Sequence, residues 1–169
     1  MWNDTDTPIG YLITFPCYGT WLPGDKRGAV DREHRRYKSP YAPANAKRSL
    51  HNQAQLKSEP VLLTALQRGC VEQASQNTCA LRKGNLHACN AHTNHVHTVV
   101  SIGTKKPEIA LNAFKANATR EMRKGGHWQH AHSPWVDHGS KRYLWTERHL
   151  ALAVDYILNG QGGDLPDFG

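Results

Sequence analysis

The feature that most constrains the fold is a pair of short β-patterned runs separated by a three-residue turn. Residues 85–91 alternate between polar and apolar side chains, and residues 95–100 read His-Val-His-Thr-Val-Val. Alternation of this kind is typical of strands, and the turn at residues 92–94 is short enough to join two antiparallel strands directly. The sequence therefore predicts a β-hairpin in the middle of the chain.

The second run of this hairpin carries two histidines. His95 and His97 flank one apolar residue, so the two-residue period of a strand puts both side chains on the same face. Their Cβ atoms should lie about 6.6 Å apart along the strand, and imidazole is a common metal ligand. The residues alone leave two interpretations open. The two histidines are either part of a divalent metal site or a purely structural pair.

Further elements follow from hydrophobic periodicity. Residues 9–15 are rich in β-forming side chains and predict a first strand that ends at Pro16. Apolar residues at three- and four-residue spacing predict one helix over residues 59–83, with Pro60 near its first turn, and a second that opens at Pro107 and stops at Gly125.

The last third of the chain completes the pattern. Residues 135–136 and 142–145 are candidates for a fourth strand, and Thr146 is a typical N-cap for a final helix that ends near Gly160. The predicted order is strand, helix, hairpin, helix, strand, helix. This is an α+β fold, a ferredoxin-like βαββαβ sandwich with an antiparallel sheet and an added C-terminal helix.

Composition narrows the classes of function. The 169 residues fit one domain spanning 1–169, and 21 Lys and Arg against 14 Asp and Glu give a net charge of +7. This surplus favours a polyanionic partner, nucleic acid before a membrane surface. No apolar run approaches the about 18 residues of a membrane span. The four cysteines lack metal-site spacing and suggest reduced thiols, so we expect a soluble, cytoplasmic protein.

Basic residues gather in two places. A long loop at about residues 17–58 is interrupted by prolines and is either a solvated connection or an arm that contacts phosphates. The helix that opens at Pro107 carries further cations on its predicted solvent-facing side. The candidate DNA-binding residues are Arg32, Arg35, Arg36, Lys38, Lys47 and Arg48 in the loop, and Lys115, Arg120 and Arg123 on the helix.

Four short motifs together resemble a known family. They are residues 11–15 (Tyr-Leu-Ile-Thr-Phe), residues 93–97 (Thr-Asn-His-Val-His), residues 142–145 (Arg-Tyr-Leu-Trp), and the segment from Tyr156 to Gln161. In this combination the chain resembles the single-tyrosine HUH transposases, and among them the REP-associated tyrosine transposases. The resemblance implies a ferredoxin-like fold, Mg²⁺ or Mn²⁺ as cofactor, a possible homodimer, and single-stranded DNA with a hairpin as partner.

The resemblance also implies roles for individual residues. Tyr156 corresponds to the nucleophile, and His95 and His97 to two metal ligands. The family's third ligand is an amide one helical turn after the tyrosine, where this chain has Gly160. We expect Gln161 to take its place, reaching the ion if the helix ends at Gly160 in a left-handed conformation, with Asn159 as the alternative.

Other interpretations of these side chains remain. Tyr156 also fits the apolar stripe of its helix, and Tyr143 is a competing nucleophile. His92 is interpreted as a turn residue beside the site, and the histidines between residues 127 and 138 as parts of a loop.

The function implied by the resemblance is DNA transposition, through metal-dependent cleavage and transfer of single-stranded DNA with a 5′-phosphotyrosine intermediate. The alternatives are a catalytically silent protein that binds DNA hairpins and a metal-dependent nuclease without a covalent intermediate.

Overall fold

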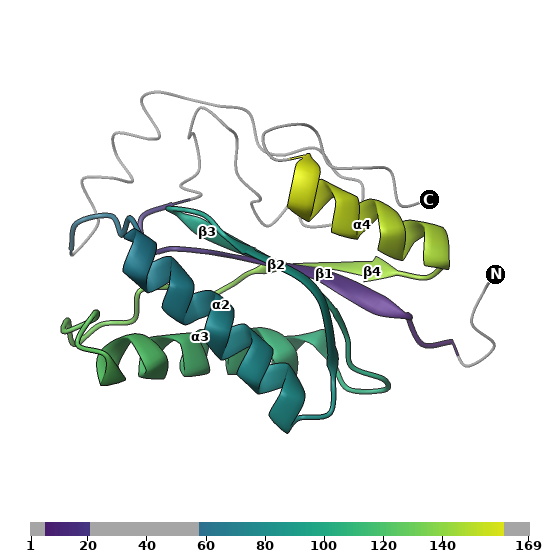
Figure 1. Ribbon diagram of the computed structural model, residues 1–169, viewed down its shortest axis with the longest axis horizontal. Helices are drawn as coiled ribbons and strands as arrows, with labels where there is room; N and C mark the ends of the chain where they lie inside the picture. The colour runs from purple at the N-terminus through teal and green to yellow at the C-terminus, as the bar shows by residue number, and fades with distance from the viewer. Residues whose placement is uncertain (1–5, 21–57, 161–169) are drawn as a thin grey trace.

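The computed structural model describes residues 6–20 and 58–160. In these residues the elements follow the predicted order (Figure 1). They are β1 (Gly10–Pro16), α2 (Ala65–Leu81), β2 (Asn85–Ala91), β3 (His95–Ser101), α3 (Pro107–Lys124), β4 (Ser140–Leu144) and α4 (Glu147–Asn159).

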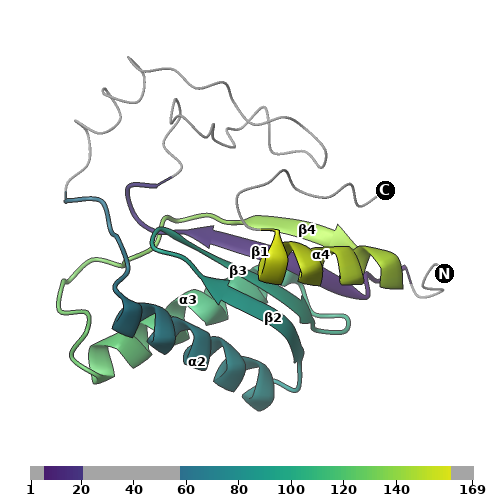
Figure 2. The same cartoon turned by 45° about the horizontal axis from the view of Figure 1, so that its top comes forward.

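The strands form one antiparallel sheet in the order β2-β3-β1-β4. The hairpin β2–β3 is present as predicted, and β1 lies between β3 and β4. Helices α2 and α3 cover one face of the sheet, and α4 lies on the other (Figures 1 and 2). The α+β, ferredoxin-like prediction is therefore confirmed, with α4 as the added helix.

Because the strands alternate, each face of the sheet has its own apolar cluster. On the side of α2 and α3 the core is built around Phe15, Val71 and Phe114. On the side of α4 it is smaller and consists of Leu12, Ala88, Val99, Leu144, Ala153 and Ile157. His97 belongs to this second face because it follows the same alternation as Val99. The smaller cluster thus fixes α4 above the strand that carries the histidines.

The predicted start of the first helix is wrong. Residues 61–63 are extended, because the amide of Val61 donates to the carbonyl of Tyr18 at 2.8 Å and that of Leu63 to the carbonyl of Thr93 at 2.6 Å. Helix α2 begins instead after Thr64, whose side chain and that of Gln67 cap each other's backbone amides. The capping box, and not Pro60, sets the N-terminus.

The structure also shows where the fourth strand begins and the state of the four cysteines. Strand β4 begins at Ser140, whereas Trp135 forms only an isolated bridge with Cys17. The four cysteines are all free, and Cys17 and Cys79 are buried. None of the helices in the described ranges has the length and apolar character needed to cross a bilayer.

Candidate metal and nucleophile site

The histidines of β3 lie under α4. His97 pairs with Thr14 of β1 on one side and Asn90 of β2 on the other, so it stands at the centre of the sheet. It is buried, and its ring centroid is 4.7 Å from that of His95. The structure therefore brings the two predicted ligands together on one face.

A third histidine joins them from the hairpin turn. The ring of His92 stacks on His95 with centroids 4.5 Å apart and lies 5.8 Å from the ring of His97. One ligand atom from each of the three lies within 4.8 Å of the others. The sequence interpretation of His92 as a turn residue beside the site did not give it a role as a ligand. The amide of His92 donates to the carbonyl of His95 at 2.8 Å, and this contact closes the turn.

Two neighbouring side chains orient the rings. The Oγ1 atom of Thr14 lies 2.7 Å from Nδ1 of His97, and Oδ1 of Asn94 lies 2.7 Å from Nδ1 of His95. Hydrogen bonds at Nδ1 direct the opposite nitrogen, Nε2, toward a ligand, as polar neighbours do around metal-binding histidines. The site thus has both candidate ligands and the groups that hold them.

The electrostatics of the site favour neutral imidazole. Burial, and then the charges of His95 and His92, lower the pKa of His97 to about 3. His97 is therefore uncharged near neutral pH, and the neutral ring is the form that binds a metal ion.

The tyrosine of α4 reaches the same place. The rings of Tyr156 and His97 are 5.6 Å apart in an edge-to-face arrangement. Ala153 and Ile157 anchor the helix on the sheet, and the side-chain amide of Asn90 donates to the carbonyl of Ile157 at 3.3 Å. These contacts place the ring of Tyr156 beside that of His97.

The competing tyrosine lies elsewhere. Tyr143 is 44% exposed, and its ring packs edge-to-face against Tyr11 at 5.2 Å. Tyr11 belongs to the core on the side of α2 and α3, so Tyr143 faces away from the histidines. The structure therefore separates the two candidate nucleophiles by the thickness of the sheet.

Of the two candidates for an amide ligand, the structure describes only Asn159. Asn159 is exposed, and its Nδ2 donates to Oδ1 of Asp155 at 3.0 Å. Gln161 lies outside the described residues. The condition under which Gln161 was expected to reach the ion, a left-handed helix end at Gly160, is not met, because Gly160 has a φ of −104° and its amide closes the last turn on the carbonyl of Tyr156.

The basic residues on α3 differ from the prediction. Lys115 was expected on the solvent-facing side, but it is buried, and its ammonium donates to the carbonyls of Val136 at 2.7 Å and His138 at 3.0 Å. Burial also lowers its pKa. The expectation is wrong because a loop folds over this part of the helix.

The other two candidate cations on α3 are exposed. Arg123 donates to the carbonyls of His130 and Ala131 at 3.1 and 3.3 Å. Arg120 lies one helical turn before it on α3. Both belong to the helix layer on the far side of the sheet from the histidines (Figure 2). The six basic candidates of the long loop, Arg32, Arg35, Arg36, Lys38, Lys47 and Arg48, lie outside the described residues.

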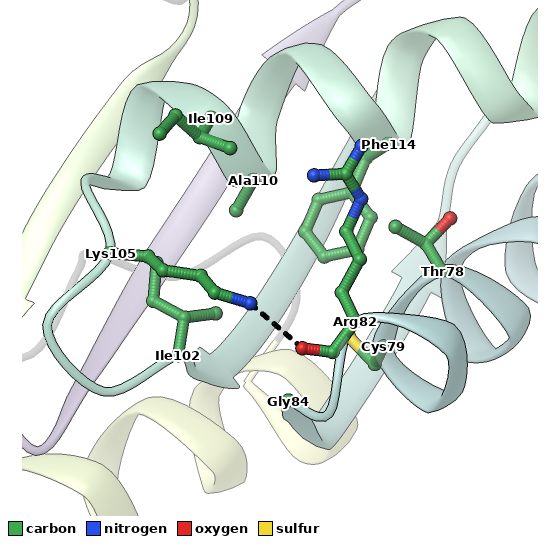
Figure 3. A pocket seen from close by; sticks show the side chains of 9 residues that line it. All are labelled: Thr78, Cys79, Arg82, Gly84, Ile102, Lys105, Ile109, Ala110 and Phe114. Atoms are coloured by element: carbon green, nitrogen blue, oxygen red, sulfur yellow. Dashed lines mark hydrogen bonds between the residues drawn. The ribbon is translucent and has the colours of Figure 1, made fainter.

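Two further places could have held a site. The histidines of the loop after α3 pack around the buried Trp128, and the only group of three potential ligands within the described ranges is the one at His92. Figure 3 shows a pocket between α2 and α3, where Lys105 donates to the carbonyl of Arg82 at 2.9 Å. Its cavity of about 20 Å³ has room for about one water molecule.

Comparison with known proteins shows a similarity of fold. No protein-family model and no curated protein matches the chain. A crystal structure described as "a putative transposase from deinococcus radiodurans r1" is 12% identical, with a TM-score of 0.50 over 96% of this chain and 98% of the other. A REP-associated tyrosine transposase bound to a REP hairpin is 11% identical, with a TM-score of 0.48 over 93% and 67%. The structural neighbours of the chain thus include proteins described as transposases, and the first of them shares its fold.

Proposed function

We propose that the protein cleaves and joins single-stranded DNA beside a hairpin, with Tyr156 as nucleophile and a divalent metal ion held by His95 and His97. One observation carries the proposal. The ring of Tyr156, from α4, lies 5.6 Å from that of His97, from β3, although 59 positions separate the two residues in the chain. A tyrosine nucleophile needs a base or a metal ion nearby, and the histidine cluster could supply either.

The proposed reaction is a transesterification. The hydroxyl oxygen of Tyr156 forms a bond to a DNA phosphorus, and the bond from that phosphorus to the 3′ oxygen breaks. The products are a 5′-phosphotyrosine and a 3′-hydroxyl, which receives the proton that the tyrosine gives up. Attack by the 3′-hydroxyl of another strand reverses the step and joins the DNA, so strand transfer requires no nucleotide cofactor.

The reaction needs help at neutral pH because a tyrosine hydroxyl ordinarily has a pKa near 10. A bound divalent ion would supply charge neutralisation at a nonbridging phosphate oxygen. The chain's own part is to hold Tyr156 on α4 in place and to keep His97 neutral and oriented.

The net charge of +7 and the described segments on either side of the basic residues support DNA as the partner. The described residues on either side of the loop are tied to the histidine turn. The amide of Cys17 donates to the carbonyl of Asn94 at 2.9 Å, and that of Leu63 to the carbonyl of Thr93 at 2.6 Å. The described segments that precede and follow residues 21–57 therefore both contact the turn beside the proposed metal site.

Replacing Arg32, Arg35 and Arg36 by Ala should weaken hairpin binding and reduce its dependence on salt, since each lost phosphate contact lowers the salt slope by about 1. Replacing Arg120 and Arg123 by Ala is the comparison, because both belong to α3, which lies on the far side of the sheet from α4 and the histidines. Equal effects of the two sets would contradict a role for the loop.

The experiment that tests the function uses end-labelled hairpin oligonucleotides of varied sequence, incubated with Mn²⁺ or EDTA and resolved on a denaturing protein gel. We expect a metal-dependent band at the mass of protein plus DNA, absent in Tyr156→Phe and retained in Tyr143→Phe. Tyr143 is a suitable control because it faces away from the histidines.

A second candidate function is hairpin binding without catalysis. It is favoured by Gly160, which has no side chain at the position where the resembled enzymes carry an amide ligand. Hairpin binding with no covalent band across the oligonucleotide pool would support this function and contradict the proposed one.

A further inference from the structure

We propose that His92 is the third protein ligand of the metal centre, so that the ion is held by three imidazoles and not by two imidazoles and an amide from the end of α4. This inference rests on the proposed function only for the role that the ion has in catalysis. The binding of the ion can be measured without DNA.

The strongest support is an unsatisfied atom. Nε2 of His92 is buried and forms no hydrogen bond with any described residue. A buried polar atom left without a partner costs about 1–3 kcal/mol, and such atoms in native proteins usually bind a water or an ion. This atom belongs to the ring that stacks on His95. An ion between the three rings would give it the partner that it lacks.

The distances are suitable for one ion. The three ligand atoms lie within 4.8 Å of one another. Around an ion with metal–nitrogen bonds of about 2.1 Å in tetrahedral geometry, ligand nitrogens are about 3.4 Å apart. The largest separation thus exceeds the tetrahedral spacing by about 1.4 Å (4.8 minus 3.4), and the proposal requires the rings to close this difference when the ion binds.

The backbone of the turn is itself well fixed. His92 donates to the carbonyl of His95 within the hairpin, and the carbonyls of Thr93 and Asn94 accept from Leu63 and Cys17. Three separate segments thus hold the turn in the position that directs His92 onto the face of His95 and His97. A preformed arrangement of this kind is what a metal site on rigid elements requires.

The alternative ligand from α4 is engaged elsewhere. The amide of Asn159 is exposed and bonded to Asp155, and the described parts of the chain bring no carboxylate into the histidine cluster. Tyr156 lies against the cluster from the helix side, where a nucleophile and not a further ligand is proposed.

Three imidazoles imply a class of metal. Neutral imidazole is a borderline nitrogen donor that suits Zn²⁺, Co²⁺ and Ni²⁺, whereas Mg²⁺ prefers oxygen ligands and retains its waters. Three protein ligands also leave a position open for a phosphate oxygen, as in catalytic zinc sites. We therefore expect Co²⁺ or Zn²⁺ to bind more tightly than Mg²⁺, which differs from the Mg²⁺ or Mn²⁺ that the family resemblance implies.

The test is a titration of the full-length protein with Co²⁺, followed by visible absorption and calorimetry in the absence of DNA. Because even a neighbour that only orients a ligand is worth about 10–100-fold in affinity, His92→Ala should weaken binding more than about tenfold, as should His95→Ala. Asn159→Ala, Gln161→Ala and the loop control His130→Ala should leave the affinity within about twofold of wild type, because the proposal gives none of these side chains a bond to the ion.

A measurement on the unaltered protein removes the risk that a variant misfolds. Addition of Zn²⁺ should change the ring ¹⁵N resonances of three of the 11 histidines, those of His92, His95 and His97. A change in His95 and His97 alone, or an affinity that falls with Gln161→Ala and not with His92→Ala, would overturn the proposal.

The two proposals fail in different ways. If the three histidines bind Co²⁺ but no covalent DNA band forms, the proposed catalytic function is wrong and the proposed metal centre stands. A covalent band that is unaffected by His92→Ala, together with unchanged Co²⁺ affinity, would remove this inference and leave the function.

Discussion

The hydroxyl of Thr14 on β1 lies 2.7 Å from Nδ1 of His97 on β3, across the central strand pair of the sheet. This contact joins a residue in the opening strand to a candidate ligand 83 positions later. It helps to orient a buried ring. The contact therefore links the fold directly to the chemistry of the site.

Thr14→Val should weaken metal binding about 10–100-fold, the range typical for loss of a group that orients a ligand, because the ring of His97 would lose the contact that directs it. The measurement is the Co²⁺ titration. Thr98→Val is the matched control, since Thr98 is the next residue along β3 and its hydroxyl donates to the carbonyl of Ile13 on the opposite face. Equal losses in the two variants would contradict an orienting role for Thr14.

Two glycines with equally open surroundings should respond oppositely to alanine. Neither Gly69, inside α2, nor Gly103, in the turn after β3, has an atom within 4 Å of an added Cβ. Gly69→Ala should raise the free energy of unfolding by about 0.5–1 kcal/mol through helix propensity. Gly103→Ala should lower it by about 1–2 kcal/mol because its φ is +65°. Urea unfolding measures both, and a destabilised Gly69→Ala would contradict the first expectation.

The part of the site that the sequence predicted depends on local geometry. His95 and His97 share a face in any strand, because the two-residue alternation holds whatever the strand packs against. The place of His92 depends on how a turn closes, and a three-residue spacing from His95 does not determine on which side of the hairpin its side chain lies.

The errors elsewhere have physical causes of the same kind. The pattern of α3 counts Lys115 as polar, and only the folded loop supplies the two carbonyls that let its ammonium be buried. The start of α2 was assigned to Pro60, although Thr64 and Gln67 form a local capping box that could have been recognised. The first error required tertiary structure to correct, whereas the second did not.

Lys115→Met should lower the free energy of unfolding by about 1–3 kcal/mol, because the carbonyls of Val136 and His138 would lose their buried donor. Arg120→Met on the same helix is exposed and should change it by less than about 0.5 kcal/mol. Chemical denaturation of both variants provides the comparison. Equal stability of the two would mean that the buried ammonium contributes nothing to the fold.

The pH dependence of stability should reveal the buried thiol of Cys17. Burial raises its pKa to about 12, so the thiolate is more easily formed in the unfolded chain, where its pKa is about 8.5. The contribution of this thiol is therefore complete below the unfolded value and is lost as the pH rises from there toward about 12. The loss should reach about 1.4 kcal/mol per pH unit once the unfolded thiol is ionised.

The comparison that isolates this effect is urea unfolding of wild type and Cys17→Ala, both reduced, at a series of pH values from neutral to about one unit above the unfolded thiol pKa. Alanine leaves a cavity whose cost does not depend on pH, so the difference between the two proteins should narrow or reverse as the pH rises. Cys70→Ala is the control, because Cys70 is only partly buried and should change the slope less. A constant difference between wild type and Cys17→Ala across this range would show that the thiol ionises equally in both states.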